Sequence, residues 1–258
     1  MKETLLHLTL PALLASAIGT AAFAADAPAL YLGPSFYQRE GPYQADTEKS
    51  LLPTGDYEGE RLLIRGDTLG LRLFTQDKLT FNAIVLSDQL SFNASAADSA
   101  ALRLLDDRKD SLNGGIEAGW KITPQDVFRI ALMGDVANRH QSTLESVHAE
   151  HVFALEKTYT QIVPRINWTY FQKGFGDYYF GISRSESQRS GIAQYHPGAS
   201  SRLDAGLTLA QPLSRDLVIF VDGVWKRFSS NISRSPMLDQ RAYVELSAGI
   251  LYNFKTFF

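Results

Sequence analysis

Two groups of residues in the sequence are of types that can carry out chemistry, and both contain histidine. His140 and Ser142, in the string RHQS, are spaced so that a β-strand would place both side chains on one face. A serine nucleophile needs such a neighbouring base, oriented by a third group such as Glu145 or Glu150, and the chemistry would be hydrolysis of a lipid ester. The surrounding stretch ANRHQSTLES is polar, however, which is typical of a loop. The sequence therefore favours an ordinary loop over a catalytic pair.

The second group, His148 and His151, has a spacing of three residues. On a strand this spacing puts the two rings on opposite faces, which argues against a shared metal ion. His196, in QYHPGAS, is most simply a loop residue. The sequence contains no cysteine and no glycine-rich phosphate-binding loop. We therefore expect no enzyme activity, no catalytic residue, no metal and no cofactor.

Alternating hydropathy indicates the elements that would position any such residue. In the segment 242–254 apolar residues occupy every second position, and Glu245, Ser247 and Asn253 lie between them. Alternation with a period of two is typical of strands that have one apolar and one polar face. It recurs at 113–122, 127–137, 160–171, 177–185 and 202–211. Only 99–109 suggests a helical period, so the chain is predicted to be all-β.

Two features favour lipid, rather than a soluble core, against the apolar faces. Aromatic residues such as Trp120, Trp168 and Tyr252 gather near strand ends, where aromatic girdles meet lipid headgroups. The polar faces combine glycine with charge, which suits a hydrated lumen. We therefore predict a transmembrane antiparallel up-and-down β-barrel, with a soluble sandwich or lipocalin as the alternative. The candidate lumen residues are Arg72, Glu117, Lys121, Arg129, Asp135, Arg165, Asp204 and Glu245.

The N-terminus has the layout of an export signal. A basic start at Lys2 precedes an apolar stretch and the small-x-small sequence that ends at Ala24. We expect residues 1–24 to be a cleaved signal peptide for the Sec pathway and 25–258 to form one barrel domain. The formal net charge of −3 does not suggest nucleic acid as a partner. The expected location is the outer membrane of a Gram-negative cell, in contact with lipid and lipopolysaccharide.

Turn residues divide the barrel into about twelve strands, with ten as the alternative. Bacterial single-chain barrels have an even number of strands. Strict alternation of strand direction then puts the loop 88–112 on the periplasmic side, where loops are usually short. Either this loop is a periplasmic feature, or the string GERLLIRGDTLGLRLF (59–74) is one strand and another boundary is wrong. The predicted strands are 30–38, 57–65, 68–75, 79–87, 113–122, 127–137, 148–156, 160–171, 177–185, 202–211, 216–228 and 241–254.

The C-terminal strand ends in an aromatic cluster. Tyr252 and Phe254 continue the apolar face, and Phe258 ends the chain four residues later. A terminal strand of this kind is the signal by which the outer-membrane assembly machinery accepts a barrel. The sequence leaves open whether Phe254 or Phe258 is the terminal aromatic of that signal.

Several soft motifs occur in one order along most of the mature chain. They are LLPTGDYEGERLLI (51–64), LLDDRKDSLNGG (104–115), DYYFGIS (177–183) with the following YHPGASSRLDAGLTLAQPLSRDLVIFVDGVWKRF, and NISRSPML (231–238). In these motifs the chain resembles the MipA/OmpV family of Gram-negative outer-membrane proteins. The string GPYQADTEKS follows the family's early element only loosely, which puts the role of the first loop in doubt.

The resemblance implies a non-enzymatic envelope protein. One member of the family is described as a scaffold that brings a lytic murein transglycosylase together with a bifunctional penicillin-binding protein. Others are described as porin-like proteins or adhesins. A scaffold role would belong to periplasm-facing segments, for which 88–112 is the candidate. The alternative functions are a narrow porin-like channel for small solutes and, less favoured, an outer-membrane lipid hydrolase.

Overall fold

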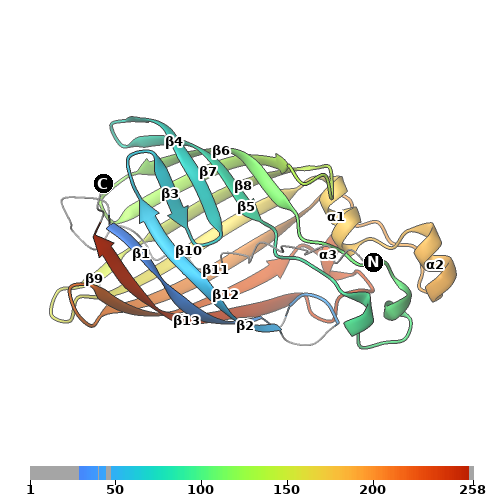
Figure 1. Cartoon of the computed structure of the whole chain (residues 1–258). Coiled ribbons are helices and arrows are strands. Elements are labelled where there is room, and N and C mark those ends of the chain that lie inside the picture. The colour runs from blue at the N-terminus through green and yellow to red at the C-terminus, as the bar shows by residue number, and fades with distance from the viewer. Residues whose placement is uncertain (1–28, 40, 45–47, 256–258) are drawn as a thin grey trace, which may run out of the picture.

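The computed structural model describes residues 29–39, 41–44 and 48–255, which form one closed antiparallel β-barrel (Figure 1). The sheet closes because β10 pairs with β8 on one side and with β11 on the other. β8 and β9 are two parts of one wall strand, so the described wall has twelve strands, as predicted. The proposed signal peptide lies outside the described residues. The strands are β1 (Ala29–Arg39), β2 (Glu48–Glu58), β3 (Leu62–Arg65), β4 (Thr68–Gln76), β5 (Leu79–Ser87), β6 (Leu112–Lys121), β7 (Asp126–Asp135), β8 (Thr143–His151), β9 (Phe153–Leu155), β10 (Thr160–Phe171), β11 (Ser200–Pro212), β12 (Leu217–Phe228) and β13 (Ala242–Lys255).

The helical segments all connect strands at one end of the barrel (Figure 1). Among the described residues no helix is long and apolar enough to cross a bilayer. The segments are the 3-10 helices η1 (Ala94–Ala96) and η2 (Leu102–Leu104) and the α-helices α1 (Lys173–Phe180), α2 (Arg184–Ser190) and α3 (Ser230–Ser233).

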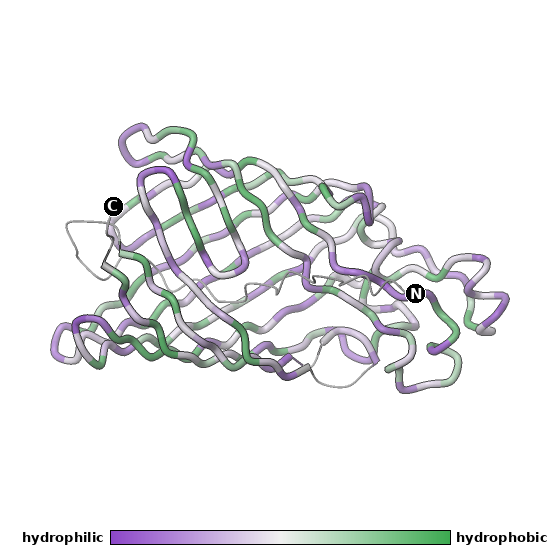
Figure 2. The backbone as a smooth tube through the Cα atoms, viewed as in Figure 1, coloured by the Kyte–Doolittle hydropathy of each residue, from purple (hydrophilic) through white to green (hydrophobic). Residues whose placement is uncertain are grey.

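The apolar faces of the strands point outward. On β13 Leu246 and Ile250 are 50% and 47% exposed, whereas Tyr243 and Glu245 are buried on the opposite face. Figure 2 shows this alternation of apolar and polar residues along the strands. A soluble β-protein would bury its apolar face, so this arrangement is that of a barrel surrounded by lipid. The interpretation with lipid outside is therefore confirmed.

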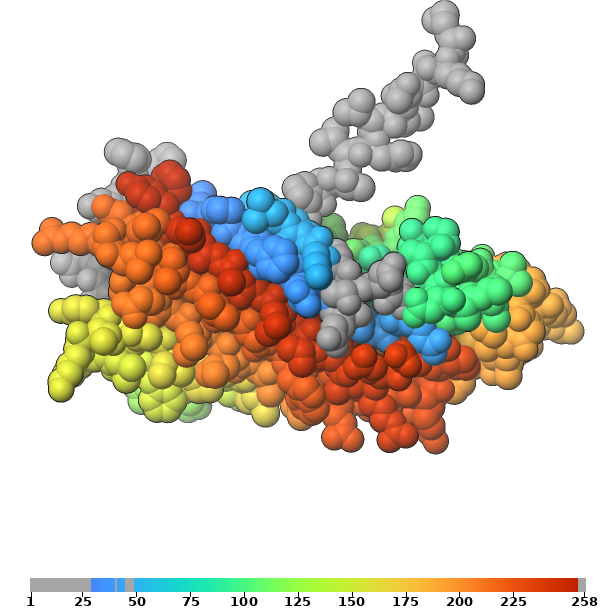
Figure 3. All heavy atoms as spheres, turned by 90° about the horizontal axis from the view of Figure 1, so that it is seen from below, coloured from blue at the N-terminus to red at the C-terminus, as the bar shows by residue number. Residues whose placement is uncertain are grey.

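The two ends of the barrel differ in the length of their connections. One end carries short turns near residues 77, 124, 157 and 214, together with both ends of the described barrel. The other end carries the long connections that contain the helical segments. Outer-membrane barrels have short periplasmic turns and longer extracellular loops. The loop 88–111 lies at the long-loop end, beside α2 (Figure 3), and therefore on the extracellular side.

The prediction that 88–112 faces the periplasm is wrong because one strand was missed. β2 occupies 48–58, where the polar string EKSLLPTGDYE shows little strand propensity. Its antiparallel pairing with β1 holds this segment as a strand. This extra strand reverses the direction of every strand up to β10. The predicted strand at 177–185 does not exist, so the two errors cancel in the strand count.

Most of the segment 177–185 is helical, with 177–180 at the end of α1 and 184–185 at the start of α2, because the aromatic residues around it also have a helical period. Phe171, Phe175 and Tyr179 recur at every fourth position, and all three are at most 1% exposed. The neighbouring Tyr178 and Phe180 give the same string a period of two, which suggested a strand. The helical conformation is favoured over a strand because it buries Phe175, Tyr179 and Phe180 together in the extracellular mouth.

Candidate functional site

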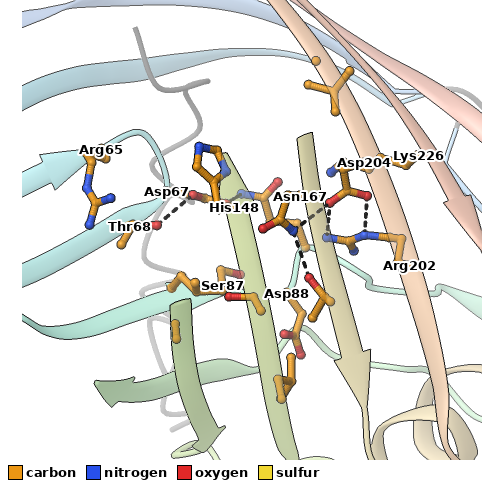
Figure 4. Close-up of a pocket in the computed structure, with 18 of the residues that line it drawn as sticks. Arg65, Asp67, Thr68, Ser87, Asp88, His148, Asn167, Arg202, Asp204 and Lys226 are labelled. Carbon is orange, nitrogen blue, oxygen red and sulfur yellow. Dashed lines mark hydrogen bonds and ion pairs between the residues drawn. The ribbon is translucent and has the colours of Figure 1, made fainter. Parts of the chain in front are cut away.

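The interior of the barrel encloses a polar cavity, referred to here as the lumen cavity. About 290 Å³ of it is accessible to the centres of water molecules, and its walls come from most of the strands (Figure 4). Five cationic side chains line it, and each is paired with a carboxylate. The pairs are Arg65–Glu117, Arg129–Glu150, Arg165–Asp222, Arg202–Asp204 and Lys226–Glu245, with N···O distances of 2.5 to 2.9 Å.

The Arg129–Glu150 pair follows directly from strand register. Arg129 on β7 pairs with His148 on β8, and Glu150 lies two residues beyond His148 on the same face. The guanidinium of Arg129 donates two hydrogen bonds to Glu150, at 2.9 and 3.2 Å. Nε2 of His148 lies 3.0 Å from the same carboxylate. The carboxylate of Glu150 is thus held in a dry site by two partners from its own hairpin.

The Arg165–Asp222 pair connects three strands and depends on a glycine. Arg165 on β10 donates to Thr208 Oγ1 at 2.6 Å and to Asp222 Oδ2 on β12 at 2.9 Å. Its guanidinium crosses β11 over Gly206, where a Cβ atom would lie 2.7 Å from Arg165 Cζ. A side chain at position 206 would displace the Arg165 guanidinium from this path, so the glycine and the charge on the polar face belong to one arrangement.

The remaining sequence-predicted lumen residues lie towards the two ends. Arg72 and Lys121 both reach Glu58, at 2.8 and 3.4 Å, near the periplasmic end of β2. Asp135, at the extracellular end of β7, accepts hydrogen bonds from the backbone N–H groups of Ala137, His140 and Gln141. Asp135 thus holds the loop after β7 in place. Of the predicted set, Glu117, Arg129, Arg165, Asp204 and Glu245 line the lumen cavity.

A packed apolar cluster fills the extracellular mouth, and we call it the mouth plug. Phe175 stacks on Phe171 with a centroid distance of 4.0 Å and also contacts Tyr179 at 4.9 Å. The cluster includes Tyr43 from the first long loop and Leu90 from 88–111. Its other buried members are Ile84, Phe92, Ala94, Ala97, Leu102, Leu105, Met133, Leu144, Phe180, Ile182, Phe228, Ile232, Met237, Leu238 and Tyr243. All the described long loops except the one after β7 therefore contribute side chains to one small core.

A second apolar cluster lies inside the periplasmic end. It contains Tyr31, Val218, Phe220 and Leu251, all at most 9% exposed, together with Ala210. The lumen is consequently layered, with apolar side chains at both ends and paired charges between them. Such layering opposes the passage of ions, because an ion would have to displace packed side chains as well as existing partners.

A buried polar group fastens the mouth plug to the barrel wall. Asp88, the first residue after β5, accepts a hydrogen bond of 2.7 Å from Tyr179 Oη on α1 and another from the side-chain amide of Asn113 on β6. His140 Nε2 lies 3.0 Å from Asn113 Oδ1. Burial raises the pKa of Asp88 to about 7, against the lowering effect of the bonds from Tyr179 and Asn113. Burial lowers the pKa of His140.

We expect Asp88→Asn to change the pH dependence of the mouth plug. Because the folded pKa of Asp88 is raised, the native plug keeps a proton that the unfolded chain releases above about pH 4. The stability of the wild type relative to the variant is therefore highest below about pH 4. It falls as the pH rises to 7, by at most about 4 kcal/mol.

The measurement is the ratio of amide hydrogen-exchange protection in α1 between the two proteins, taken at each pH. The ratio cancels the intrinsic exchange rate, which the two proteins share. Parallel protection profiles from pH 4 to 8 would contradict the assignment of this titration to Asp88.

The histidine candidates are dispersed. His140 and Ser142 lie in the loop after β7, but His140 Nδ1 and Ser142 Oγ are both buried without a hydrogen-bond partner, so they do not bond to each other. His148 lies in the lumen, and His151 pairs with Asp126 near the periplasmic rim. His196 lies exposed near Asp177. The described residues contain no group of three or more potential metal ligands.

The proposed assembly signal is only partly described. Tyr252 and Phe254 are 48% and 45% exposed on the outer face of β13, with their rings 5.0 Å apart. They lie where a periplasmic aromatic girdle would meet headgroups. Phe258 lies outside the described residues.

Sequence reasoning missed Asp222, Lys226, Arg202 and Asp67 as lumen residues, although the alternation on β11 and β12 contains the first three. It missed the mouth plug, because the plug residues come from several loops and strand ends that are far apart in the sequence.

Comparison with known proteins finds matches across the whole described barrel. A family model described as MltA-interacting protein MipA matches residues 29–254. The putative outer membrane protein YiaT of Escherichia coli K12 is 25% identical over 231 residues, covering 89% of this chain and 93% of that protein. The MltA-interacting protein of the same strain is 28% identical over 218 residues, covering 83% and 86%. A solved outer membrane channel from Pseudomonas putida F1 is 10% identical with a TM-score of 0.45, covering 92% and 98%.

Proposed function

Because this chain belongs to the MltA-interacting protein MipA family, we propose that it is a non-enzymatic scaffold that binds a murein transglycosylase at the periplasmic face of the outer membrane. The chain is an outer-membrane β-barrel, and relatives such as YiaT and OmpV are named as outer membrane proteins. The transglycosylase as partner, and a penicillin-binding protein joined through it, are proposed from the relative named MltA-interacting protein.

The layered lumen is the observation that favours a scaffold function over a channel function. Every cationic side chain that lines the lumen cavity is paired, and packed apolar clusters occupy both ends. A barrel filled in this way suits a rigid support for an assembly. The alternative is a narrow channel, for which the lumen cavity would be the widest part.

The periplasmic turns offer a surface for such a partner. The turn after β9 and the turn after β11 are joined through Gln211, whose side chain accepts from Thr160 Oγ1 at 2.5 Å and donates to the Thr158 carbonyl at 2.9 Å. This joined pair presents Tyr159 and Leu213, which are 73% and 57% exposed. Exposed aromatic and aliphatic side chains on a rigid support are typical anchors of protein interfaces.

We expect Tyr159→Ser combined with Leu213→Ser to weaken retention of a purified murein transglycosylase at least tenfold, because both proposed anchors are removed. The measurement is pull-down on the refolded, immobilised barrel, with folding checked by heat-modifiable gel mobility. The matched control is Leu104→Ser, which removes an exposed apolar side chain at the opposite, extracellular end and should leave retention unchanged. Absence of retention by the wild type, or equal loss in the control, would refute the proposed surface.

A further inference from the structure

Two carboxylates that line the lumen cavity, Asp67 and Asp88, form no ion pair with a lysine or arginine of the described residues. Asp88 is engaged instead by Tyr179 and Asn113 at the mouth plug. Each of the five lining cations already has the carboxylate partner given above. Asp67, in the turn between β3 and β4, also lines the cavity. Its carboxylate accepts hydrogen bonds from two neutral side chains, Thr68 Oγ1 and Gln89 Nε2, both at 3.3 Å, and within the described part of the chain it has no ion pair with a lysine or arginine. A carboxylate held away from bulk water without a cation is costly, so a ligand that supplies one is favoured.

The groups around Asp67 are suited to a hydroxylated ligand. Figure 4 shows Asp67 and His148 projecting into one space, with Asn167 and Ser87 on neighbouring walls. The side-chain amide nitrogen of Asn167 is engaged by Thr169 and Asp204, which leaves its carbonyl oxygen as the group that can serve a ligand. Serine hydroxyls from three further strands line the same space, namely Ser87, Ser146 and Ser247. Hydroxyl groups and an amide oxygen can accept from or donate to sugar-like hydroxyls, whereas they offer little to an apolar ligand.

The position of the cavity couples occupancy to the mouth plug. Phe175 and Asp88 belong to the plug region and also line the cavity. A ligand that binds only the folded cavity stabilises the fold by mass action. Occupancy would therefore increase protection of α1, even though the ligand does not touch the outer surface.

We propose that the lumen cavity binds a small hydroxylated ammonium compound, with its ammonium group on Asp67 and its hydroxyl groups on the surrounding serines and Asn167. The volume of about 290 Å³ is close to the lower end of small-molecule sites and limits the ligand to roughly the size of one sugar ring. This inference is independent of the scaffold function, because it concerns the lumen rather than the periplasmic turns.

The test is calorimetric titration of the refolded full-length barrel at low ionic strength with two probes of similar shape, D-glucosamine and the neutral methyl glucoside. We expect the wild type to bind glucosamine at least tenfold more tightly than the glucoside. Asp67→Asn should weaken glucosamine binding at least tenfold while heat-modifiable mobility is unchanged, because the amide keeps the shape and loses the charge. The matched control is Asp106→Asn, which removes an exposed carboxylate in the extracellular loop 88–111 and should bind like the wild type.

Three results would overturn the proposal. They are no binding of glucosamine to the wild type, equal affinity for both probes, and undiminished binding by a folded Asp67→Asn variant. Increased hydrogen-exchange protection of α1 with glucosamine, absent in that variant, gives a second readout that does not depend on binding heat.

Discussion

Replacing Glu150 with alanine is expected to lower the free energy of unfolding of the barrel by about 3–5 kcal/mol, the cost typical of breaking a buried ion pair. The Glu150 side chain is only 1% exposed, and Arg129 and His148 both contact it. Its removal leaves the Arg129 guanidinium, a side chain only 12% exposed, without its direct ion-pair partner. Urea titration followed by heat-modifiable gel mobility measures the change.

The double variant Arg129→Met with Glu150→Met separates the cost of an unpaired charge from the loss of the pair. Replacing a whole buried ion pair with apolar groups of similar volume is often neutral or stabilising. We therefore expect the double variant to be much closer to the wild type than Glu150→Ala. As a control, Arg189→Gln breaks the exposed pair with Asp106 and should cost less than about 1 kcal/mol. A double variant as unstable as Glu150→Ala would show that side-chain packing in the lumen, rather than the ion pair, stabilises this site.

Phe175→Ala is expected to destabilise the mouth plug by about 3–5 kcal/mol, as is typical for truncating a buried aromatic residue. The Phe175 ring is 1% exposed and contacts Phe171, Tyr179 and His140, so the cavity left behind is bordered by groups from three segments. Because the wall is held by its own backbone ladder, we expect the barrel itself to remain folded.

The readout for Phe175→Ala is cleavage by added protease in the loops that carry α1 and α2, with gel mobility as the test of the barrel. The variant should be cleaved at least tenfold faster than the wild type while its heat-modifiable mobility persists. Leu104→Ala, at an exposed position of the same end, should be cleaved at the wild-type rate. Loss of both loops and barrel together would mean that the plug is part of the barrel's folding unit.

The strands of the barrel wall were predictable from sequence because the residues within each strand alternate between those that face lipid and those that face the lumen. β5 and β10 have the predicted bounds of 79–87 and 160–171, since lipid on one face and a charged lumen on the other enforce strict alternation. β2 was not predicted because its sequence shows no alternation of apolar and polar residues. It is a strand because it pairs with β1. An error in one strand reverses the orientation of those that follow, which is why 88–112 was assigned to the wrong side.

The interior was less predictable because its order is non-local. The sequence identifies Arg165 as a charge on the polar face, but not that Asp222, 57 positions later, receives it across Gly206. The mouth plug combines residues from several long loops and strand ends that are far apart in the sequence, so no single periodic pattern identifies it. Asp67 shows the same limit, since it is distinguished by having no lysine or arginine partner among the described residues, and this can be seen only once the lumen is assembled.

The central claim is that this barrel is a closed scaffold rather than a channel, and the conductance of the refolded protein in a planar bilayer tests it most directly. Heat-modifiable mobility of the same preparation shows that the barrel has folded. The layered lumen predicts a folded barrel without discrete conductance steps across the usual voltage range. Reproducible single-channel steps from the folded wild-type protein would contradict the account and make the lumen ion pairs the walls of a pore.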